Sequence, residues 1–174
     1  SLLNPALPLA DILTASVNGK AGFNKDYAGV HAEGKVALID ADASAVLGTD
    51  DFNVKADVSA KVLSAEGFVK CEADSEGNFA VGFKGEATAA NVKASVGGSA
   101  FGVEVEGKEV SLLGAKVGGK AGGGVDASAY IESQKAIDLG DVNINATNIH
   151  VGAQLGLGFE IDLTVPTISF DWPW

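Results

Sequence analysis

The first residues whose types and spacing could do chemistry are His31 and Glu33, which lie two positions apart with Lys35 following at the same interval. Alternate residues of a β-strand share one face, so a histidine and a carboxylate placed this way can act as an acid–base pair or as metal ligands. Three polar residues on the solvent-facing side of a strand explain the same spacing more simply. His150 has no partner whose proximity the sequence indicates. We therefore predict no catalytic residue and no enzymatic activity.

Four aspartates, Asp40, Asp42, Asp50 and Asp51, bracket one predicted strand and could gather at a turn around a calcium ion. Their spacing does not fit the calcium loop of helix–loop–helix proteins, which needs a central glycine and a distal glutamate. Acidic residues of solvated turns explain them better. We predict no metal site and no cofactor, although an apolar ligand is possible.

Six glycines fall between positions 114 and 124. They do not form the Gly-x-Gly-x-x-Gly pattern, and no strand–helix–strand unit surrounds them, so a phosphate-binding loop is not predicted. Glycines at this density allow either a bend with close approach of another backbone or a flexible loop. Both alternatives stay open, and we favour the bend.

Three aromatic residues are the candidate binding residues. Trp172 and Trp174 stand within the last three positions, and Tyr27 follows a turn signal at 24–26. Tryptophan rings can anchor at a membrane interface or contact a protein partner. The two tryptophans could equally fold back and plug an open end of the sheet.

Two further residues carry known chemistries. Cys71 is the only cysteine, so the chain has no internal disulfide, and we interpret it as a structural thiol. Asn145 begins an Asn-Ala-Thr glycosylation pattern, which matters only for a secreted eukaryotic protein.

The charges exclude several classes of function. The chain has 12 lysines, no arginine and 23 acidic residues, giving a net charge of −11. This charge repels nucleic acids and anionic membrane surfaces. Without a guanidinium group, the usual bidentate ligand for phosphate is missing. Nucleotide chemistry and nucleic-acid binding are therefore disfavoured.

Alternation of apolar and polar residues dominates the chain and is clearest over 50–96, where Val54, Ala56 and Val58 face away from Lys55 and Asp57. Gly, Asn and Asp signals divide the alternating stretches. We predict strands at 14–23, 29–38, 41–47, 53–63, 65–73, 79–87, 91–100, 103–110, 112–120, 125–131, 141–146, 148–159 and 161–165. The predicted fold is an all-β, antiparallel meander of about ten to thirteen strands, forming a barrel or a two-layer stack.

Turn signals precede Tyr27, Phe52 and Phe79, at spacings of 25 and 27 residues. They predict an internal repeat of about 25 residues over 14–96, made of two strands and two turns. Positions 151–165 carry the longest alternating apolar face, which we predict to lie in the main core. We predict three parts: an N-terminal arm or lid at 1–14, a single β domain at 15–165, and an aromatic tail at 166–174.

The segments Gly-Thr-Asp-Asp-Phe-Asn-Val-Lys-Ala-Asp-Val-Ser-Ala-Lys-Val-Leu, Lys-Ala-Ser-Val-Gly-Gly and Leu-Gly-Leu-Gly-Phe-Glu-Ile-Asp-Leu resemble the Gly/Ala-rich β-repeat segments of some bacterial polymorphic toxins. In those proteins the segment lies between a secretion module and a C-terminal toxin domain. The resemblance covers 27–163 and implies a β fold without catalytic residues. No toxin domain follows the segment in this sequence.

Three functional hypotheses remain. The first is a non-enzymatic scaffold, extracellular or at the cell surface, that binds a protein partner or self-associates. The second is a carrier of an apolar lipid or pigment, in a barrel lumen lined by Ala56, Ala60, Ala87 and Ala89. The third is a membrane-active or pore-forming β protein. Alternation and the terminal aromatics favour the third, whereas the scarcity of tyrosine and the charges expected on both sides of several strands oppose it.

Overall fold

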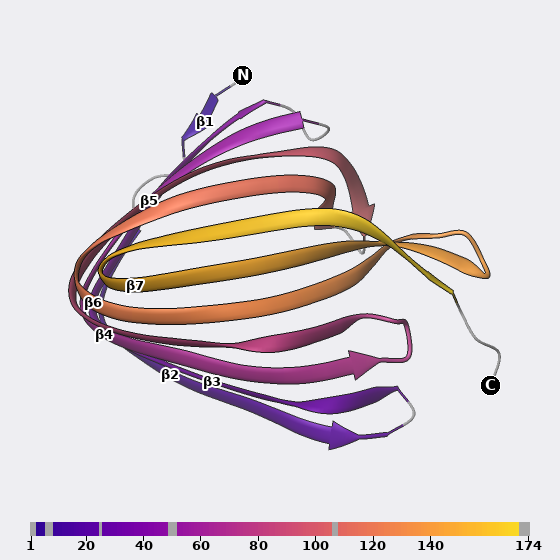
Figure 1. The fold of residues 1–174 in the computed structure, drawn as a ribbon, viewed down its shortest axis with the longest axis horizontal. Helices are drawn as coiled ribbons and strands as arrows, with labels where there is room; N and C mark the ends of the chain where they lie inside the picture. Colours follow the sequence, from indigo (N-terminus) through magenta and orange to yellow (C-terminus); the bar gives the residue numbers. More distant parts are fainter. Residues whose placement is uncertain (1–2, 6–8, 25, 49–51, 106–107, 171–174) are drawn as a thin grey trace.

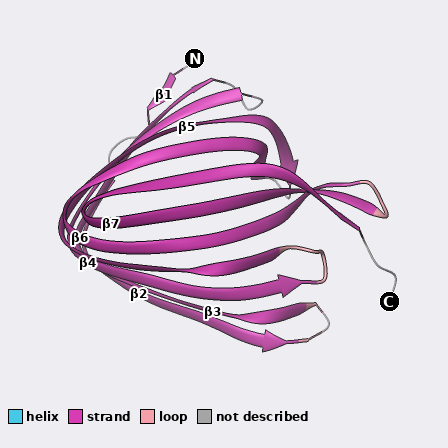
Figure 2. Cartoon of the chain, viewed as in Figure 1, coloured by secondary structure: helices cyan, strands magenta, loops and turns pink. Residues whose placement is uncertain are grey.

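The computed structural model describes residues 3–5, 9–24, 26–48, 52–105 and 108–170. These residues form strands joined by short turns, as Figure 2 shows. The strands are β1 (Leu3–Pro5), β2 (Leu9–Phe23), β3 (Tyr27–Gly48), β4 (Phe52–Asp74), β5 (Phe79–Val105), β6 (Lys108–Asp138) and β7 (Val142–Phe170). Tyr27, Phe52 and Phe79, the three residues that follow turn signals, are each the first residue of a strand.

All pairings are antiparallel and belong to one open sheet, in the order β1-β3-β4-β5-β6-β7, with β2 also paired to β3. Because β1 pairs with the end of β3 at Leu47 and β2 pairs with the rest of it, the two short strands share one position at the sheet edge. The described strands therefore occupy six positions in a meander. β2 lies at one edge of the sheet and β7 at the other.

Each long strand bends near its middle, and the bends line up across the sheet. The ladder between β3 and β4 omits Leu38 and Leu63, and the ladder between β4 and β5 omits Leu63 and Ala89. Leu13 and Leu63 have φ of 55° and 48°, which turns the chain direction sharply. In Figure 1 the long strands turn back along this line at the left, and the hairpins lie at the right.

The bend passes through the glycine-rich part of β6. The register between β6 and β7 shifts between Ala121 and Val125, opposite Gly156. A Cβ atom on Gly122, whose φ is +150°, would lie 2.1 Å from the carbonyl oxygen of Ala90. A larger residue has no room there, so the glycines allow the bend and the close approach of β5. The structure agrees with the bend that we favoured and not with a flexible loop.

The prediction of an all-β antiparallel meander is confirmed, but the count of ten to thirteen strands and the barrel or two-layer stack are wrong. Most predicted strands join in pairs or threes, so that 53–63 and 65–73 form the two halves of β4. The polar and glycine residues interpreted as turns fall at the bend or supply one face of a continuous strand. Alternation alone does not distinguish a bend from a turn.

Burial is inverted relative to an ordinary globular domain. Among the described residues, the buried apolar residues are Ala37 and Ala146, whereas sixteen polar or charged residues are buried. The apolar face of β7 lies outside, with Leu155 83% and Leu157 78% exposed. The prediction that this face lies in the main core is therefore wrong. The bent sheet encloses its polar side because each strand places its charged residues there.

Candidate functional site: a polar cavity and an apolar outer face

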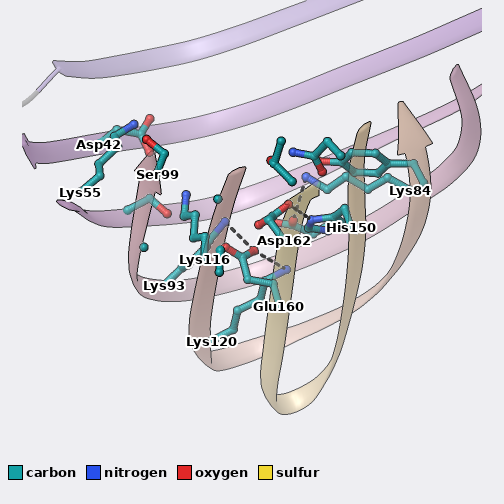
Figure 3. Close-up of a pocket in the computed structure, with 18 of the residues that line it drawn as sticks. Asp42, Lys55, Lys84, Lys93, Ser99, Lys116, Lys120, His150, Glu160 and Asp162 are labelled. Carbon is teal, nitrogen blue, oxygen red and sulfur yellow. Dashed lines mark hydrogen bonds and ion pairs between the residues drawn. The ribbon is translucent and has the colours of Figure 1, made fainter. Parts of the chain in front are cut away.

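The inner, concave side of the bent sheet holds an open cavity of about 650 Å³. Residues from β3 to β7 line it, including seven of the twelve lysines of the chain and five acidic residues. Figure 3 shows Lys93, Lys116 and Lys120 directed into this space together with Glu160. The lysines in its lining are Lys35, Lys55, Lys61, Lys84, Lys93, Lys116 and Lys120.

Every lysine in the cavity lining has a carboxylate partner. Lys93 lies 2.6 Å from Glu160, and Lys116 lies 2.9 Å from Asp57. The remaining pairs are Lys35 with Asp40, Lys55 with Asp57, Lys61 with Glu66 and Glu86, Lys84 with Glu66 and Glu86, and Lys120 with Asp126 and Glu160. The cavity is therefore highly charged but internally neutralised, so it offers an anionic ligand little uncompensated positive charge.

Several of these ion pairs connect the two halves of one strand across its bend. Lys61 and Glu66 lie on either side of Leu63 in β4, with Nζ and Oε2 separated by 2.8 Å. Lys120 and Asp126 form the same arrangement across the glycines of β6, and both side chains are buried. Breaking such a pair would leave an uncompensated buried charge. The pairs therefore stabilise the bend from inside.

The electrostatic environment shifts the pKa of several inner groups. Burial acts to raise the pKa of Glu86, but the charges of Lys61, Lys84 and Lys120 outweigh burial and hold this pKa below its usual value. Burial lowers the pKa of Lys84. Burial, with the nearby charges of Asp162 and Glu160, raises the pKa of Tyr130 to about 12. The carboxylate of Glu86 is therefore favoured in its ionised form.

Ser128, His150 and Asp162 form a hydrogen-bonded chain at one side of the cavity. Ser128 Oγ lies 3.1 Å from His150 Nε2, and His150 Nδ1 lies 2.5 Å from Asp162 Oδ1. Burial acts to raise the pKa of Asp162, but the hydrogen bond from His150 and the nearby positive charges, including those of Lys116 and Lys93, together outweigh burial and lower this pKa. An ionised Asp162 requires His150 to donate through Nδ1, so that in a neutral imidazole Nε2 accepts the Ser128 proton.

This order of groups is that of a serine nucleophile, its base and the acid that orients the base. The access that such chemistry needs is missing, because Ser128 is 4% exposed and lies outside the cavity lining. The ring of Tyr130 stacks on His150 at a centroid distance of 4.4 Å. The arrangement satisfies polar groups inside the bend, and we assign it to packing. No spacing in the sequence indicates this arrangement, because Asp162 reaches His150 only through the bend of β7.

The outer, convex side of the sheet has the opposite chemistry. Apolar residues alternate with the inner polar ones, and many are exposed, including Val69 at 62% and Leu63 at 58%. We define the outer face by the outward positions of β4 and β7, none of which is charged. They are Val54, Ala56, Val58, Ala60, Val62, Ala65, Gly67, Val69, Cys71 and Ala73 in β4, and Ile149, Val151, Ala153, Leu155, Leu157, Phe159, Ile161 and Leu163 in β7.

The structure brings together some of the residues considered in the sequence. His31 Nε2 lies 3.5 Å from Glu33 Oε2 on the inner side, as their spacing predicts, while Lys35 pairs instead with Asp40. Asp42 is exposed, and Asp50 and Asp51 lie outside the described residues. Within the described ranges, no three His, Cys, Asp or Glu residues are close enough to hold a metal ion.

The aromatic candidates are only partly described. Tyr27 donates a hydrogen bond of 2.9 Å to Glu72, and the Nζ atom of Lys20 lies 3.6 Å from its ring centroid. Its hydroxyl is therefore already used within the sheet. Trp172 and Trp174 lie outside the described residues, so their role stays a prediction.

The structure also shows where the remaining residues considered in the sequence lie. Ala56, Ala87 and Ala89 are exposed, so the expected lumen lined by these alanines is wrong, and the enclosed cavity is polar. Cys71 is exposed on the outer face. Asn145 is 4% exposed and donates a hydrogen bond to Ser169 Oγ, which leaves no room for a glycan in this fold.

Comparisons of the chain with protein-family models, with curated proteins and with solved structures find no match. The resemblance to the β-repeat segments of polymorphic toxins therefore stays a prediction, as do the repeat and the domain boundaries. The described residues contain no helix long and apolar enough to cross a membrane.

Proposed function

We propose that this chain is a non-enzymatic β-scaffold that attaches to the apolar layer of a lipid membrane through its outer face. The observation that carries the proposal is the separation of side chains between the two sides of the sheet. The outward positions of β4 and β7 contain no charged residue, and the ion pairs lie on the inner side. Apolar side chains toward lipid and polar ones toward an inner space are typical of β structures in membranes.

The curvature of the sheet favours lipid over a second copy as the cover of this face. The outer face is convex, and the concave surface that the sheet encloses is the cavity lined by seven lysines. Stacking a convex face into the concave face of another copy would bury charged residues against apolar ones, which is unfavourable. Two convex faces touch over a limited area, whereas lipid chains adapt to any shape.

The net charge indicates which lipids suit this face. With a net charge of −11, the protein is repelled by anionic headgroups, and its outer face has no lysine to attract them. We therefore expect binding to neutral phosphatidylcholine vesicles to exceed binding to vesicles rich in anionic lipid. Added salt should reduce the difference by screening the repulsion.

Flotation of the protein with phosphatidylcholine vesicles tests the proposal. Leu157→Asp places a charge on the outer face at a residue that is 78% exposed, so it should leave the fold intact. We expect flotation to weaken by at least about tenfold, because placing a carboxylate at the centre of an apolar layer costs about 2.5–3.5 kcal/mol. Leu139→Asp is the matched control, since Leu139 is 63% exposed but lies in the turn between β6 and β7.

Cys71 supplies a second readout, because it is the only cysteine and lies exposed on the outer face. Vesicles should slow its reaction with a water-soluble maleimide. In the Cys71→Ser background, a cysteine introduced at Ser59 on the inner side should keep its rate. Failure to float, together with an oligomer in buffer in which Cys71 is already protected from the maleimide, would show that another copy covers the face and would refute the proposal.

A further inference from the structure

No further described strand covers either edge of the sheet, whereas most soluble β proteins protect their sheet edges. β7 pairs with β6 on one side, and none of the described residues pairs with its other side. Its 29 residues contain no lysine, the residue that natural proteins most often place on an edge to block further pairing. Among the described residues, β2 pairs with β3 alone, along one side, and it carries one lysine, Lys20. Both edges therefore offer backbone groups for additional strands.

The number of strand positions decides which edges of two copies can pair, and in which direction. Six alternating positions give β2 and β7 opposite directions, so a neighbouring copy in the same orientation presents an antiparallel partner. Pairing of β7 with β7 is also antiparallel, but it leaves two β2 edges open. Head-to-tail pairing of β7 with the β2 edge of the next copy uses both edges of every chain through one kind of junction, whereas pairing through β7–β7 needs a second, β2–β2 junction to do the same.

The bends fix the register of this junction. β2 bends at Leu13 and β7 bends at Gly156, both on the line that crosses the sheet. Aligning the two bends places small outward residues opposite larger ones and keeps the outer face free of charge across the junction. The opposed pairs are Ala15 with Leu155, Val17 with Ala153, Gly19 with Val151 and Ala21 with Ile149.

We infer that copies of this chain associate head to tail, with β7 of one copy paired to β2 of the next in the register that opposes Val17 and Ala153. The inference rests on the sheet edges and the bends, so it does not depend on what covers the outer face. Lipid would strengthen the association, because unpaired backbone groups cost more free energy in an apolar layer than in water.

Disulfide cross-linking tests the inference. In the Cys71→Ser background, Val17→Cys and Ala153→Cys are made as separate proteins, mixed with and without phosphatidylcholine vesicles, and oxidised. Opposed residues of antiparallel strands can form a disulfide, so we expect roughly fivefold more cross-linked dimer in the mixture than with either protein alone. A mixture of Val17→Cys with Ile149→Cys, four residues out of register, is the matched control.

The outcomes separate the alternatives. A dimer of the Ala153→Cys protein alone, in excess over the mixture, would show β7–β7 pairing and overturn the inference. Equal cross-linking with the Ile149→Cys control would show unspecific collision and overturn it as well. Flotation is measured on the same samples. Vesicle binding without cross-linking would overturn this inference alone, whereas cross-linking without vesicle binding would overturn only the proposed membrane function.

Discussion

Asn91 and Gln154 exchange two hydrogen bonds, of 2.9 and 3.1 Å, although they lie on β5 and β7 with β6 between them. Both side chains are buried. The contact is possible because Asn91 is paired in the ladder with Gly122 of β6, which has no side chain to separate the two amides. The amide pair therefore joins strands that the backbone ladder does not join, at the inside of the bend.

Replacing Asn91 by alanine should leave the buried amide of Gln154 partly unsatisfied. We expect the free energy of unfolding to fall by about 1–3 kcal/mol. The double variant with Gln154→Ala should lose less than the sum of the two single variants, because the two groups share their bonds. Urea unfolding measures these values. Asn18→Ala, which removes an exposed hydrogen bond to Glu33, is the control and should change stability by less than about 0.5 kcal/mol.

Glycine is required at Gly122 by both space and backbone conformation. With φ at +150° and a Cβ position 2.1 Å from a carbonyl oxygen, Gly122→Ala should destabilise the fold by about 1–3 kcal/mol. Gly119→Ala in the same strand is the matched control, since a Cβ there meets nothing within 4 Å. Thermal unfolding of the two variants compares them. Equal melting temperatures would show that the bend at Gly122 is not formed as described.

The alternating pattern of the sequence predicts an all-β antiparallel meander, because period two places side chains on two faces wherever a strand runs, but it does not give the number of strands. It could not show which face is enclosed. The face of Leu155 and Leu157 was expected to be the core, since burial of apolar residues is the usual outcome. Here the bend encloses the charged face instead. The bend itself occurs at leucines such as Leu13 and Leu63, residues that carry no turn signal.

The partners of His150 illustrate the same limit. Ser128 lies on β6 and Asp162 lies 12 residues after His150 on the other half of β7. Spacing along a straight strand would place Asp162 far from His150. Only the position of the bend, at Gly156, makes the contact, and one glycine among many gives no such information in the sequence.

Acid should destabilise the protein. The pKa values of Glu86 and Asp162 are lower in the folded state than their usual values near 4. Each ionised carboxylate therefore contributes stability that is fully present above about pH 4 and is lost as the pH falls through the lower, folded-state value. We expect the melting temperature to decrease below about pH 4.

Glu86→Gln tests the origin of this acid dependence. The variant should melt at a lower temperature at pH 7, because Lys61 and Lys84 lose a carboxylate partner, and its melting temperature should change less on acidification. Glu76→Gln, at an exposed residue of the turn between β4 and β5, is the control. A Glu86→Gln curve parallel to that of the unchanged protein would contradict the assignment.

The tryptophans provide a probe of the C-terminal tail, because the only two in the chain are Trp172 and Trp174. If the tail anchors at a membrane interface, tryptophan emission should shift to shorter wavelength when neutral vesicles are added. Replacing both residues by alanine should then weaken flotation. If the protein floats without a shift of emission, the outer face alone accounts for binding, and the predicted anchoring role of the tryptophans is wrong.

Ser128 should not act as a nucleophile, even though His150 and Asp162 are arranged behind it. At 4% exposure and outside the cavity lining, its hydroxyl is closed to an ester or a fluorophosphonate probe. Intact-mass measurement after incubation with a fluorophosphonate should show no adduct. Ser133, equally buried in β6 and hydrogen-bonded to Thr147, gives the background expected of a structural serine. An adduct that maps to Ser128 and disappears in His150→Gln would instead show that the bend assembles a working catalytic site.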